Sequence, residues 1–374
     1  MKTDKSSRPT LTATPTSTVA PASPTATTGQ PLQPYPVAIA RASSYDLKLV
    51  LRQLETLFDN LGGLGDVIKP GDRVAIKVNL TGGPSQQPPA GMNPVDTYVT
   101  HPVVVHAMAE LLHDAGAKEV YIVEGVFDQE SYPDWGYVDA AEAVGARLID
   151  LNDALPYADY ASLPVGKNWL IYEKFTMNRI LQEVDASISV AKMKCHWICG
   201  VTLSMKNLVG LVPAQFYGGL VRSDFHGTED ELKHRLPRVV VDLNRARPAN
   251  VSLIDGIKTI DGSEGPWNQN VTPKSPGILI GGKNPVATDA VAVAAMGFDP
   301  TAEYPDPPFL RAYNHLNIAR QLGLGSNHLR EIAIKGVPLA DVKQQFKPAY
   351  APTGFEKGTS YYSCVSAHDN LWKR

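Results

Sequence analysis

Apolar residues recur at two spacings from Tyr35 onward, one typical of helices and one typical of strands. In residues 46–61 leucine and valine follow helical spacing, whereas in residues 73–80 valine and isoleucine alternate with other residues, as in a strand. The same patterns predict further helices at about residues 101–115, 135–144, 178–183, 200–208, 229–245, 285–296 and 309–322, and further strands at 37–40, 119–124, 147–151, 186–191, 251–254, 278–280 and 329–334. Strands that alternate with helices favour an α/β fold, with a mostly parallel sheet and helices on both faces.

Two segments depart from this alternation. Residues 161–174 are predicted to form a small β-hairpin insertion that turns at residues 165–168. Residues 7–34 are rich in threonine, proline and alanine and almost free of charge, so they bury too little apolar surface to offset the entropy of ordering. We therefore expect residues 1–34 to be a disordered linker and residues 35–374 to form one α/β domain.

The linker also bears on location. Tracts rich in threonine and proline commonly tether exported bacterial domains, which favours an extracytoplasmic protein held at the membrane of a bacterial envelope. A cytoplasmic protein with a disordered tail is the alternative. No apolar run is long enough to span a bilayer, and no apolar signal segment precedes the linker, so any export signal has been removed or never existed.

Composition excludes some classes of function. The chain has 35 basic and 38 acidic residues, a net charge of −3, so it lacks the basic surface that nucleic-acid binding requires. Its three cysteines, Cys195, Cys199 and Cys364, are too few for a cluster held by four thiolates, and no iron–sulfur cluster is expected. Buried thiols are the favoured interpretation, and the sequence does not select a disulfide pair.

Polar residues gather where the predicted strands end. In open α/β sheets, ligands bind in the crevice outside the carboxyl ends of the strands. Lys77 and Asn79 end one strand, where a lysine either extends to solvent or meets an anion. His101 begins a helix after a long loop and can point into the same crevice. We take Lys77, Asn79 and His101 as candidate ligand-binding residues.

The densest polar cluster lies further along the chain, around a glycine that begins a predicted helix. Ammonium groups and helix N-termini both favour anions. We assign catalytic roles to Lys194, His196 and Lys206, with His196 as the general acid or base. Thr202 and Asn207 are candidate ligand contacts, and Thr202 would share a helix face with Lys206. A solvated loop with chance lysines is the alternative.

Acidic residues offer a candidate cation site. Asp255 and Glu264 lie in a glycine-rich loop after a strand, and Asp289 follows residues 281–288, which we expect at the same sheet edge. Carboxylates are ligands of hard divalent cations, so a divalent metal is one candidate cofactor. Turns built on Asp-Gly pairs explain the first two carboxylates equally well, and the helix dipole alone would favour Asp289.

Taken in order, these segments resemble the domain-of-unknown-function 362 family over about residues 35–300. The resemblance is carried by Lys77-Val78-Asn79, Thr100-His101-Pro102, Ala115-Gly116-Ala117, Glu124-Gly125, Lys194 to His196, Thr202 with Lys206-Asn207 and Gly210, Asp255-Gly256, Glu264-Gly265-Pro266, and Asn284-Pro285 through Asp289. It implies no assigned activity, and this chain lacks the cysteine runs of the ferredoxin-like module that some members carry. The helix–Ala-Gly-Ala–strand pattern is more distantly similar to the N-terminal domain of nickel-pincer lactate racemases, from which no chemistry is carried over.

These observations converge on a protein that binds or transforms a small anionic ligand in a crevice lined by lysine, histidine and aspartate. The alternatives are a non-catalytic envelope binding protein and a structural subunit of an envelope complex. The residues name neither the substrate nor the reaction.

Overall fold

The computed structural model describes residues 35–85, 92–228, 230–268 and 271–350. The predicted linker, residues 1–34, and Cys364 lie outside these ranges. None of the helices in the described ranges is both long enough and apolar enough to cross a membrane.

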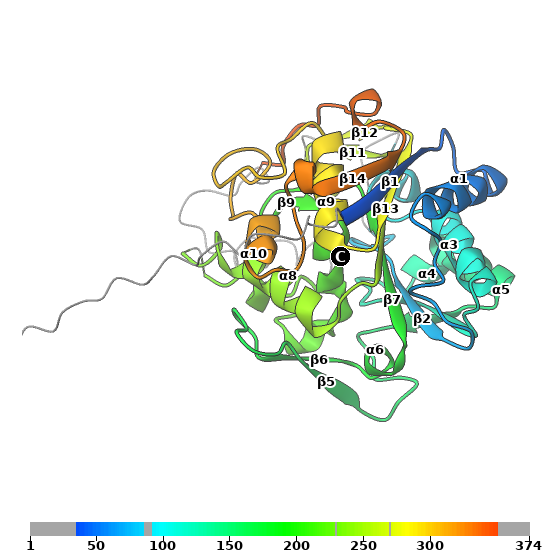
Figure 1. Ribbon diagram of the computed structural model, residues 1–374. Coiled ribbons are helices and arrows are strands. Elements are labelled where there is room, and N and C mark those ends of the chain that lie inside the picture. The colour runs from blue at the N-terminus through cyan, green and yellow to red at the C-terminus, as the bar shows by residue number, and fades with distance from the viewer. Residues whose placement is uncertain (1–34, 86–91, 229, 269–270, 351–374) are drawn as a thin grey trace, which may run out of the picture. The chain divides into compact units, whose positions relative to one another are not determined.

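An eight-stranded sheet forms the centre of these residues (Figure 1). Its strands in spatial order are β14 (Ile332–Gly336), β1 (Tyr35–Arg41), β13 (Ile278–Gly282), β10 (Val251–Gly256), β7 (Ala186–Lys192), β2 (Arg73–Lys77), β3 (Glu119–Glu124) and β4 (Arg147–Asp150). Every neighbouring pair is parallel except the two pairs that β13 makes, with β1 and with β10. The expected mostly parallel sheet is confirmed, with one strand reversed.

The reversal of β13 follows from the segment that precedes it. Parallel neighbours need a long crossover, usually a helix. The chain instead leaves β10 through a small hairpin of β11 (Thr259–Asp261) and β12 (Thr272–Lys274), and returns antiparallel. Gly282 therefore ends beside Ser252, at the amino end of β10. The prediction that residues 281–289 leave the same sheet edge as the other polar clusters is wrong.

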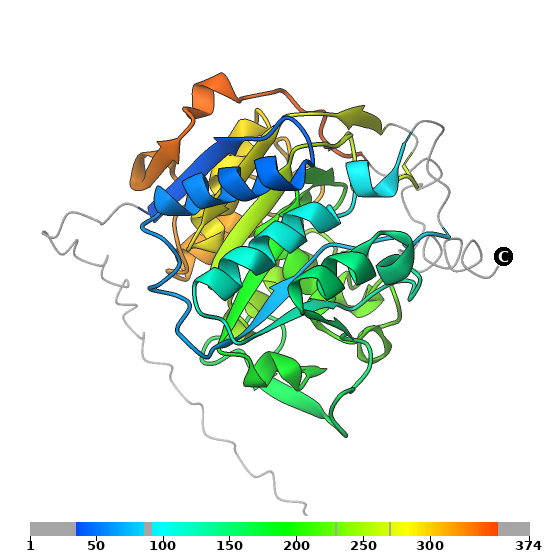
Figure 2. The ribbon, with the colours of Figure 1, turned by 90° about the vertical axis from the view of Figure 1, so that its right-hand side faces the viewer.

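Helices cover both faces of the sheet (Figures 1 and 2). One face carries α1 (Leu47–Asp59), α3 (Pro102–Asp114) and α5 (Tyr137–Val144), and the other carries α7 (Ser204–Asn207), α8 (Arg235–Ala246), α9 (Pro285–Ala295) and α10 (His315–Gln321). Shorter elements are α2 (Pro94–Thr97), α4 (Ser131–Asp134), α6 (Ile180–Glu183), η1 (Leu208–Leu211), η2 (Ala214–Phe216), η3 (Ser223–Phe225), η4 (Leu329–Glu331) and η5 (Leu339–Asp341).

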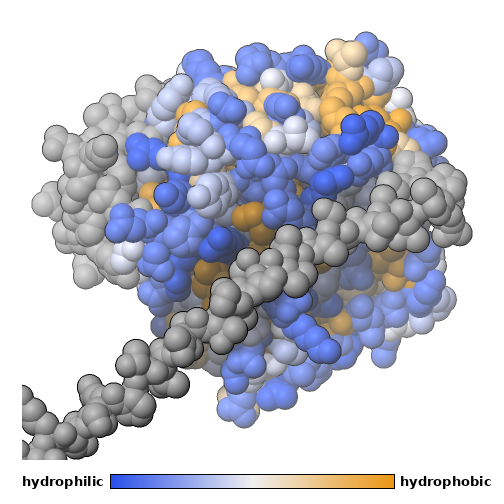
Figure 3. Space-filling view, turned by 60° about the vertical axis from the view of Figure 1, so that its left-hand side comes forward, coloured by the Kyte–Doolittle hydropathy of each residue, from blue (hydrophilic) through white to orange (hydrophobic). Residues whose placement is uncertain are grey.

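The two faces divide the apolar core into two layers. In β1, Val37 and Ile39 join the layer under α8 and α9, whereas Ala38 and Ala40 join the layer under α1 and α3. Burial of each such valine or isoleucine side chain contributes about 1.5–3 kcal/mol to the free energy of folding. On the face drawn in Figure 3, hydrophilic residues predominate and hydrophobic ones form smaller patches. Most large apolar side chains are thus buried between the sheet and its helices.

The predicted hairpin exists, but its turn lies elsewhere. Strands β5 (Tyr160–Pro164) and β6 (Lys174–Asn178) pair antiparallel with Pro164 opposite Lys174, so the connection is longer than residues 165–168. The carboxylate of Asp242 accepts hydrogen bonds from the backbone N–H groups of residues 170–172 and fixes this long loop to α8. The predicted turn is therefore wrong, because the loop is held by Asp242 of a helix that lies far away in the sequence.

The single helix predicted over residues 200–208 is also wrong. Residues Gly200–Thr202 form strand β9, which pairs with β8 (Lys194–His196), and α7 starts only at Ser204. Asp289 sets this start, because its carboxylate accepts the N–H groups of Ser204 and Met205, both at 2.8 Å. Thr202 and Lys206 therefore do not share a helix face.

Candidate functional site

The chain changes direction between β2 and β7, which are neighbours in the sheet. From β2 it continues toward β3 on one side, and from β7 it continues toward β10 on the other. A crevice opens outside the carboxyl ends of strands at such a switch point, and ligands bind there. Lys77 ends β2 at this point, and Lys194 follows β7.

Lys77 meets a carboxylate of the protein itself. Its Nζ lies 2.7 Å from Glu124 Oε1 and donates to the carbonyl oxygen of Val78 at 2.6 Å, and the lysine is only 2% exposed. Burial lowers the pKa of Lys77 to about 8, against the opposing effect of Glu124. Lys77 thus neither extends to solvent nor has its charge free for a ligand.

Asn207 ties α7 to the two strands. Its Nδ2 donates to the carbonyl oxygen of Lys77 and to Ser189 Oγ, both at 3.1 Å, and its Oδ1 accepts from Asn79 Nδ2 at 3.2 Å. Asn207 is therefore saturated. The other amide atom of Asn79, Oδ1, is buried and has no hydrogen-bond partner within the described ranges.

A second buried ion pair joins β7 to β10. Lys192 Nζ lies 2.8 Å from Asp255 Oδ2 and 2.9 Å from the Tyr45 hydroxyl, which itself donates to Asp255 Oδ1 at 2.9 Å. His101 stacks on Tyr45 with ring centroids 3.6 Å apart, and its Nδ1 accepts the N–H of Val103 at 3.2 Å. Burial lowers the pKa of His101 to about 4. Internal partners thus occupy both Asp255 and His101.

The ammonium of Lys194 contacts the backbone of Glu264 and not its carboxylate. Lys194 Nζ donates to the carbonyl oxygens of Tyr98 and Glu264, at 2.6 and 2.9 Å. The Glu264 carboxylate accepts from the N–H of Trp197 at 3.1 Å and from Trp267 Nε1 at 2.9 Å. Burial lowers the pKa of Lys194 well below its usual value.

The three predicted metal ligands do not come together. Asp255 binds Lys192, Glu264 binds tryptophan N–H groups, and Asp289 caps α7. Burial raises the pKa of Asp289 to about 7. Across the part of the chain that the structure describes, no three histidine, cysteine, aspartate or glutamate side chains are arranged to hold a metal ion.

Lys206 differs from the other crevice lysines. It is partly exposed, and its ammonium makes no hydrogen bond or ion pair with the residues that the structure describes. Its charge lowers the pKa of His196, His226 and His315, so it lies within Coulombic range of all three rings. Burial is the larger cause in each case, and the pKa values of His226 and His315 fall to about 3. All three imidazoles are therefore neutral at pH 7.

Backbone contacts fix the tautomer of His196. Its Nδ1 accepts the N–H groups of Ile198 and Cys199, at 3.1 and 3.2 Å. A neutral imidazole carries one proton, which must then be on Nε2. His196 therefore presents a hydrogen-bond donor, which is a narrower role than the predicted general acid or base.

His226 and His315 complement it. His226 Nδ1 lies 3.2 Å from the carbonyl oxygen of Arg222, which can only accept, so Nδ1 carries the proton and Nε2 the lone pair. Both ring nitrogens of His315 and the hydroxyl of Thr202 are buried without a hydrogen-bond partner among the residues described. Buried polar atoms are normally satisfied, so these mark a place for water or a ligand.

Arg222 adds a fixed positive charge. It is 2% exposed, has a left-handed φ of 52°, and donates to the carbonyl oxygens of Gly125, Val212 and Leu220 at 2.8 to 3.2 Å. These partners are neutral. Lys77 and Lys192 have carboxylate partners, whereas Lys194, Lys206 and Arg222 form no ion pair with a carboxylate in the described ranges. The cationic side chains without an ion pair thus outnumber the carboxylate of Glu264, which also lacks a cationic partner in these ranges.

The cysteines offer no nucleophile here. Cys195 and Cys199 are buried free thiols, as expected from the sequence. Burial raises the pKa of Cys199 to about 12 and that of Cys195 further, so both stay protonated at neutral pH.

Sequence reasoning did not assign roles to Tyr45, Lys192, Arg222 or His315. Lys192 was visible as part of a lysine cluster, but alternation alone does not say which lysine meets a carboxylate. His315 begins α10 behind its N-cap, Asn314, and lies inside a helix predicted to start earlier, so no local signal marked it.

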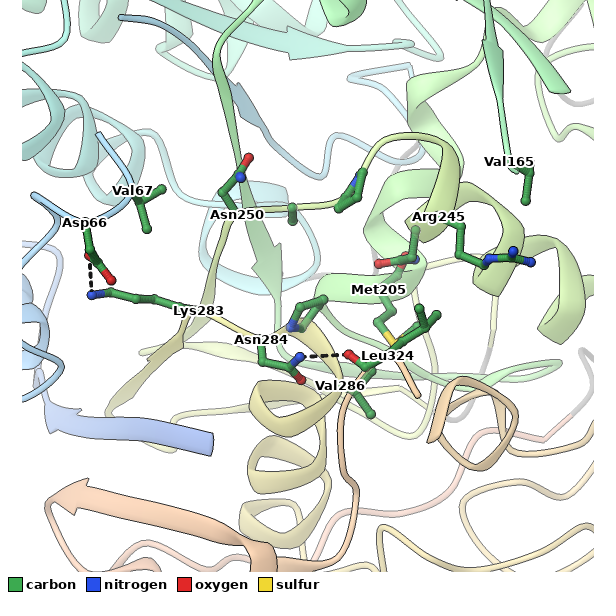
Figure 4. A pocket seen from close by; sticks show the side chains of 14 residues that line it. Asp66, Val67, Val165, Met205, Arg245, Asn250, Lys283, Asn284, Val286 and Leu324 are labelled. Carbon is green, nitrogen blue, oxygen red and sulfur yellow. Dashed lines mark hydrogen bonds and ion pairs between the residues drawn. The ribbon is translucent and has the colours of Figure 1, made fainter. Parts of the chain in front are cut away.

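A separate cavity of about 690 Å³ lies at the opposite edge of the sheet (Figure 4). Lys283, bound to Asp66 at 2.6 Å, and Asn284, which donates to the carbonyl oxygen of Leu324 at 2.8 Å, lie on its wall. Its polar groups are largely paired, although Asn244 Oδ1 is not. No predicted site residue lines it, and the candidate site stays at the carboxyl edge.

Fold and crevice define an α/β protein whose candidate site lies at a switch point of a mostly parallel sheet. A family model described as "Domain of unknown function (DUF362)" matches residues 74–294, more than half of the chain. The chain belongs to this family, as its motifs predicted.

One relative is named as a thylakoid-associated protein of Synechocystis sp. (strain ATCC 27184 / PCC 6803 / Kazusa). It is 26% identical over 316 residues, which cover 82% of this chain and 88% of the relative.

Two solved structures are similar in part. The lactate racemase apoprotein from Thermoanaerobacterium thermosaccharolyticum is 16% identical, with a TM-score of 0.34 over 66% of this chain and 56% of that one. A protein from Thermotoga maritima is 13% identical, with a TM-score of 0.32 over 63% and 55%. This chain thus matches just over half of each, and neither similarity bears on function.

Proposed function

We propose that this protein binds a small anionic ligand in the crevice at the carboxyl ends of β2 and β7 and transfers protons to or from it. The observation that supports this is that Lys194, Lys206 and Arg222 form no ion pair with a carboxylate in the described ranges. Arg222 is buried, and a buried charge without a charged partner costs several kcal/mol, which a bound anion would offset.

Lys206 is the proposed direct contact, because it is partly exposed and its three donors are unused within the described ranges. The guanidinium of Arg222 is bonded to backbone carbonyls, so we expect it to attract the anion through its positive charge without a direct hydrogen bond to it. The Nε2–H of His196 and the hydroxyl of Thr202 would complete the ligand shell. The shell therefore offers donors to an anion rather than ligands to a metal.

Proton transfer is assigned to His315. Its ring has both nitrogens unpaired among the described residues, so it can take a proton at one nitrogen while donating at the other. A binding protein without catalysis is the second candidate, and histidine substitution separates the two. Retained binding with lost turnover in His315→Gln favours catalysis, whereas binding without turnover in the wild type, unchanged in the variant, favours the binder.

Ligand binding is tested by calorimetric titration of the full chain with inorganic phosphate and with glycolate. We expect a saturable heat that Lys206→Gln abolishes and that Lys118→Gln retains. Lys118 is exposed and lies at the amino end of β3, far from the crevice. If neither anion binds, or if Lys206→Gln binds as the wild type does, the proposed function is wrong.

We also propose that the chain lies outside the cytoplasm at a membrane, with residues 7–34 as a tether. The composition of that tract and the thylakoid association named for the Synechocystis relative support this. Fractionation of cells that express the full chain tests it. Recovery of the protein with cytoplasmic markers would contradict the proposal.

A further inference from the structure

Four lysines lie at or near the carboxyl ends of β2 and β7, and three of them have partners within the protein. Lys77 and Lys192 bind carboxylates, and Lys194 donates to two backbone carbonyls. Lys206 alone among these four has an amine free of such partners in the described residues, and it is also the one that retains partial exposure. The amine of Lys206 is therefore accessible to a ligand, although most of the side chain is surrounded by protein.

The surroundings of Lys206 lower the pKa of its amine. Burial is the largest cause and lowers its pKa, whereas Cys199 and Glu264 raise it, and the guanidinium of Arg222 makes a smaller contribution that lowers it again. Each unit by which a lysine pKa falls raises the fraction of free amine at neutral pH about tenfold. A desolvated lysine of this kind is the usual nucleophile toward carbonyl carbon.

We infer that Lys206 forms an imine with the carbonyl carbon of a small substrate that also carries a carboxylate. The inference rests on the proposed function, because the cationic side chains without an ion pair are what attract the carboxylate. It adds that the ligand is an oxo acid and that the amine reacts with it covalently.

The step balances without another reactant. The lone pair of neutral Nζ attacks the carbonyl carbon, the C–N bond forms, and the π electrons move to oxygen. One proton passes from nitrogen to that oxygen, which gives a carbinolamine. The second nitrogen proton passes to the hydroxyl, which leaves as water while the C=N bond forms, and water reverses the sequence.

The histidines suit the two ends of this step. The Nε2–H of His196 would donate to the developing oxyanion, since its Nδ1 already accepts from the backbone. His315 would relay the proton from Nζ to that oxygen, accepting at one ring nitrogen as it releases from the other, so that the ring stays neutral. Both rings lie within Coulombic range of Lys206.

The probe is glyoxylate, the smallest aldehyde that carries a carboxylate, with glycolate as a control of equal charge that lacks the carbonyl. The full chain is incubated with each at pH 7 in the presence of sodium cyanoborohydride, and peptides are mapped by mass spectrometry. We expect a reduced adduct on Lys206 at more than ten times its level on Lys194 or exposed Lys118. An adduct on Lys206 no higher than on Lys118 overturns the inference.

Lys206→Arg keeps the charge but removes the nucleophile. We expect it to retain phosphate binding and to lose the glyoxylate adduct at this position without new adducts in the crevice. If phosphate binds to wild type and no adduct forms on Lys206, the imine is wrong and the proposed function stands. If neither phosphate nor glyoxylate binds, both are wrong. Circular dichroism melts of each variant show that a lost adduct does not come from unfolding.

Discussion

Gly210 offers a sharp test of the buried pair between Lys77 and Glu124. A Cβ at position 210 would overlap Glu124 Oε1 and lie 2.8 Å from Lys77 Nζ. Glu124 has nowhere to move cheaply, because its carboxylate also accepts the N–H groups of Leu80 and Gly125, both at 3.0 Å. The substitution Gly210→Ala should therefore separate the two charges while both stay buried.

The size of the effect follows from that separation. Breaking a buried ion pair costs about 3–5 kcal/mol, since one charge is left without its partner. Urea unfolding followed by circular dichroism measures the loss. Gly65→Ala is the matched control, because nothing lies within 4 Å of the new methyl group and its φ is not left-handed. It should stay within about 1 kcal/mol of the wild type. A Gly210→Ala loss no larger than that of Gly65→Ala would refute the described role of the pair.

Three further outcomes are expected. The pKa of Asp289 is raised from 3.8 to about 7, so its contribution to stability is full below pH 3.8 and is lost as pH rises through 7. At about 1.36 kcal/mol per pKa unit, the unfolding free energy falls by roughly 4 kcal/mol between pH 4 and pH 8, and a flat difference profile between wild type and Asp289→Asn would contradict this. Arg222→Met leaves three buried carbonyl oxygens without their donor and should lower the free energy of unfolding in urea by about 3 kcal/mol or more. Lys206→Gln should change it by less than about 1 kcal/mol. Equal losses in the two variants would contradict the different roles given to Arg222 and Lys206. Gly200→Ala places a methyl group 2.7 Å from Phe309 at a φ of 78° and should lower the melting temperature, which an unchanged melt would rule out.

The fold was predictable from sequence where local pattern and tertiary packing agree. The helix of α3 begins at Pro102 as expected, and the strand predicted at residues 186–191 appears as Ala186–Lys192. Pattern failed at residues 200–208, because the start of α7 is set by Asp289, which lies 85 positions away from Ser204. It failed at β13 for a related reason, since strand direction depends on a connection and not on the strand itself.

The positions of the candidate residues in the fold could be predicted from the sequence, but their pairing could not. Strand ends directed attention to Lys77, Lys194 and Lys206, and all three lie at the carboxyl edge. Which lysine is neutralised depends on the facing strand, because Lys192 stands opposite Asp255 in the register of β7 and β10. That register is invisible in a single sequence, and so the paired lysines could not be told from the unpaired one.

Two different cationic residues would carry out the two tasks of the crevice, which are attraction of the anion and attack on its carbonyl carbon. Attraction of an anion needs charges that persist at neutral pH, and Arg222 cannot deprotonate in that range. Attack on a carbonyl needs an amine that has lost its proton, and Lys206 combines a pKa lowered by burial with an amine that has no internal partner among the described residues. If one residue had to do both, raising its nucleophilicity would weaken the attraction. With a permanent charge held by Arg222, Lys206 can lose its proton while a positive charge remains in the crevice, and its conservative replacement by arginine is therefore expected to spare binding and abolish the adduct.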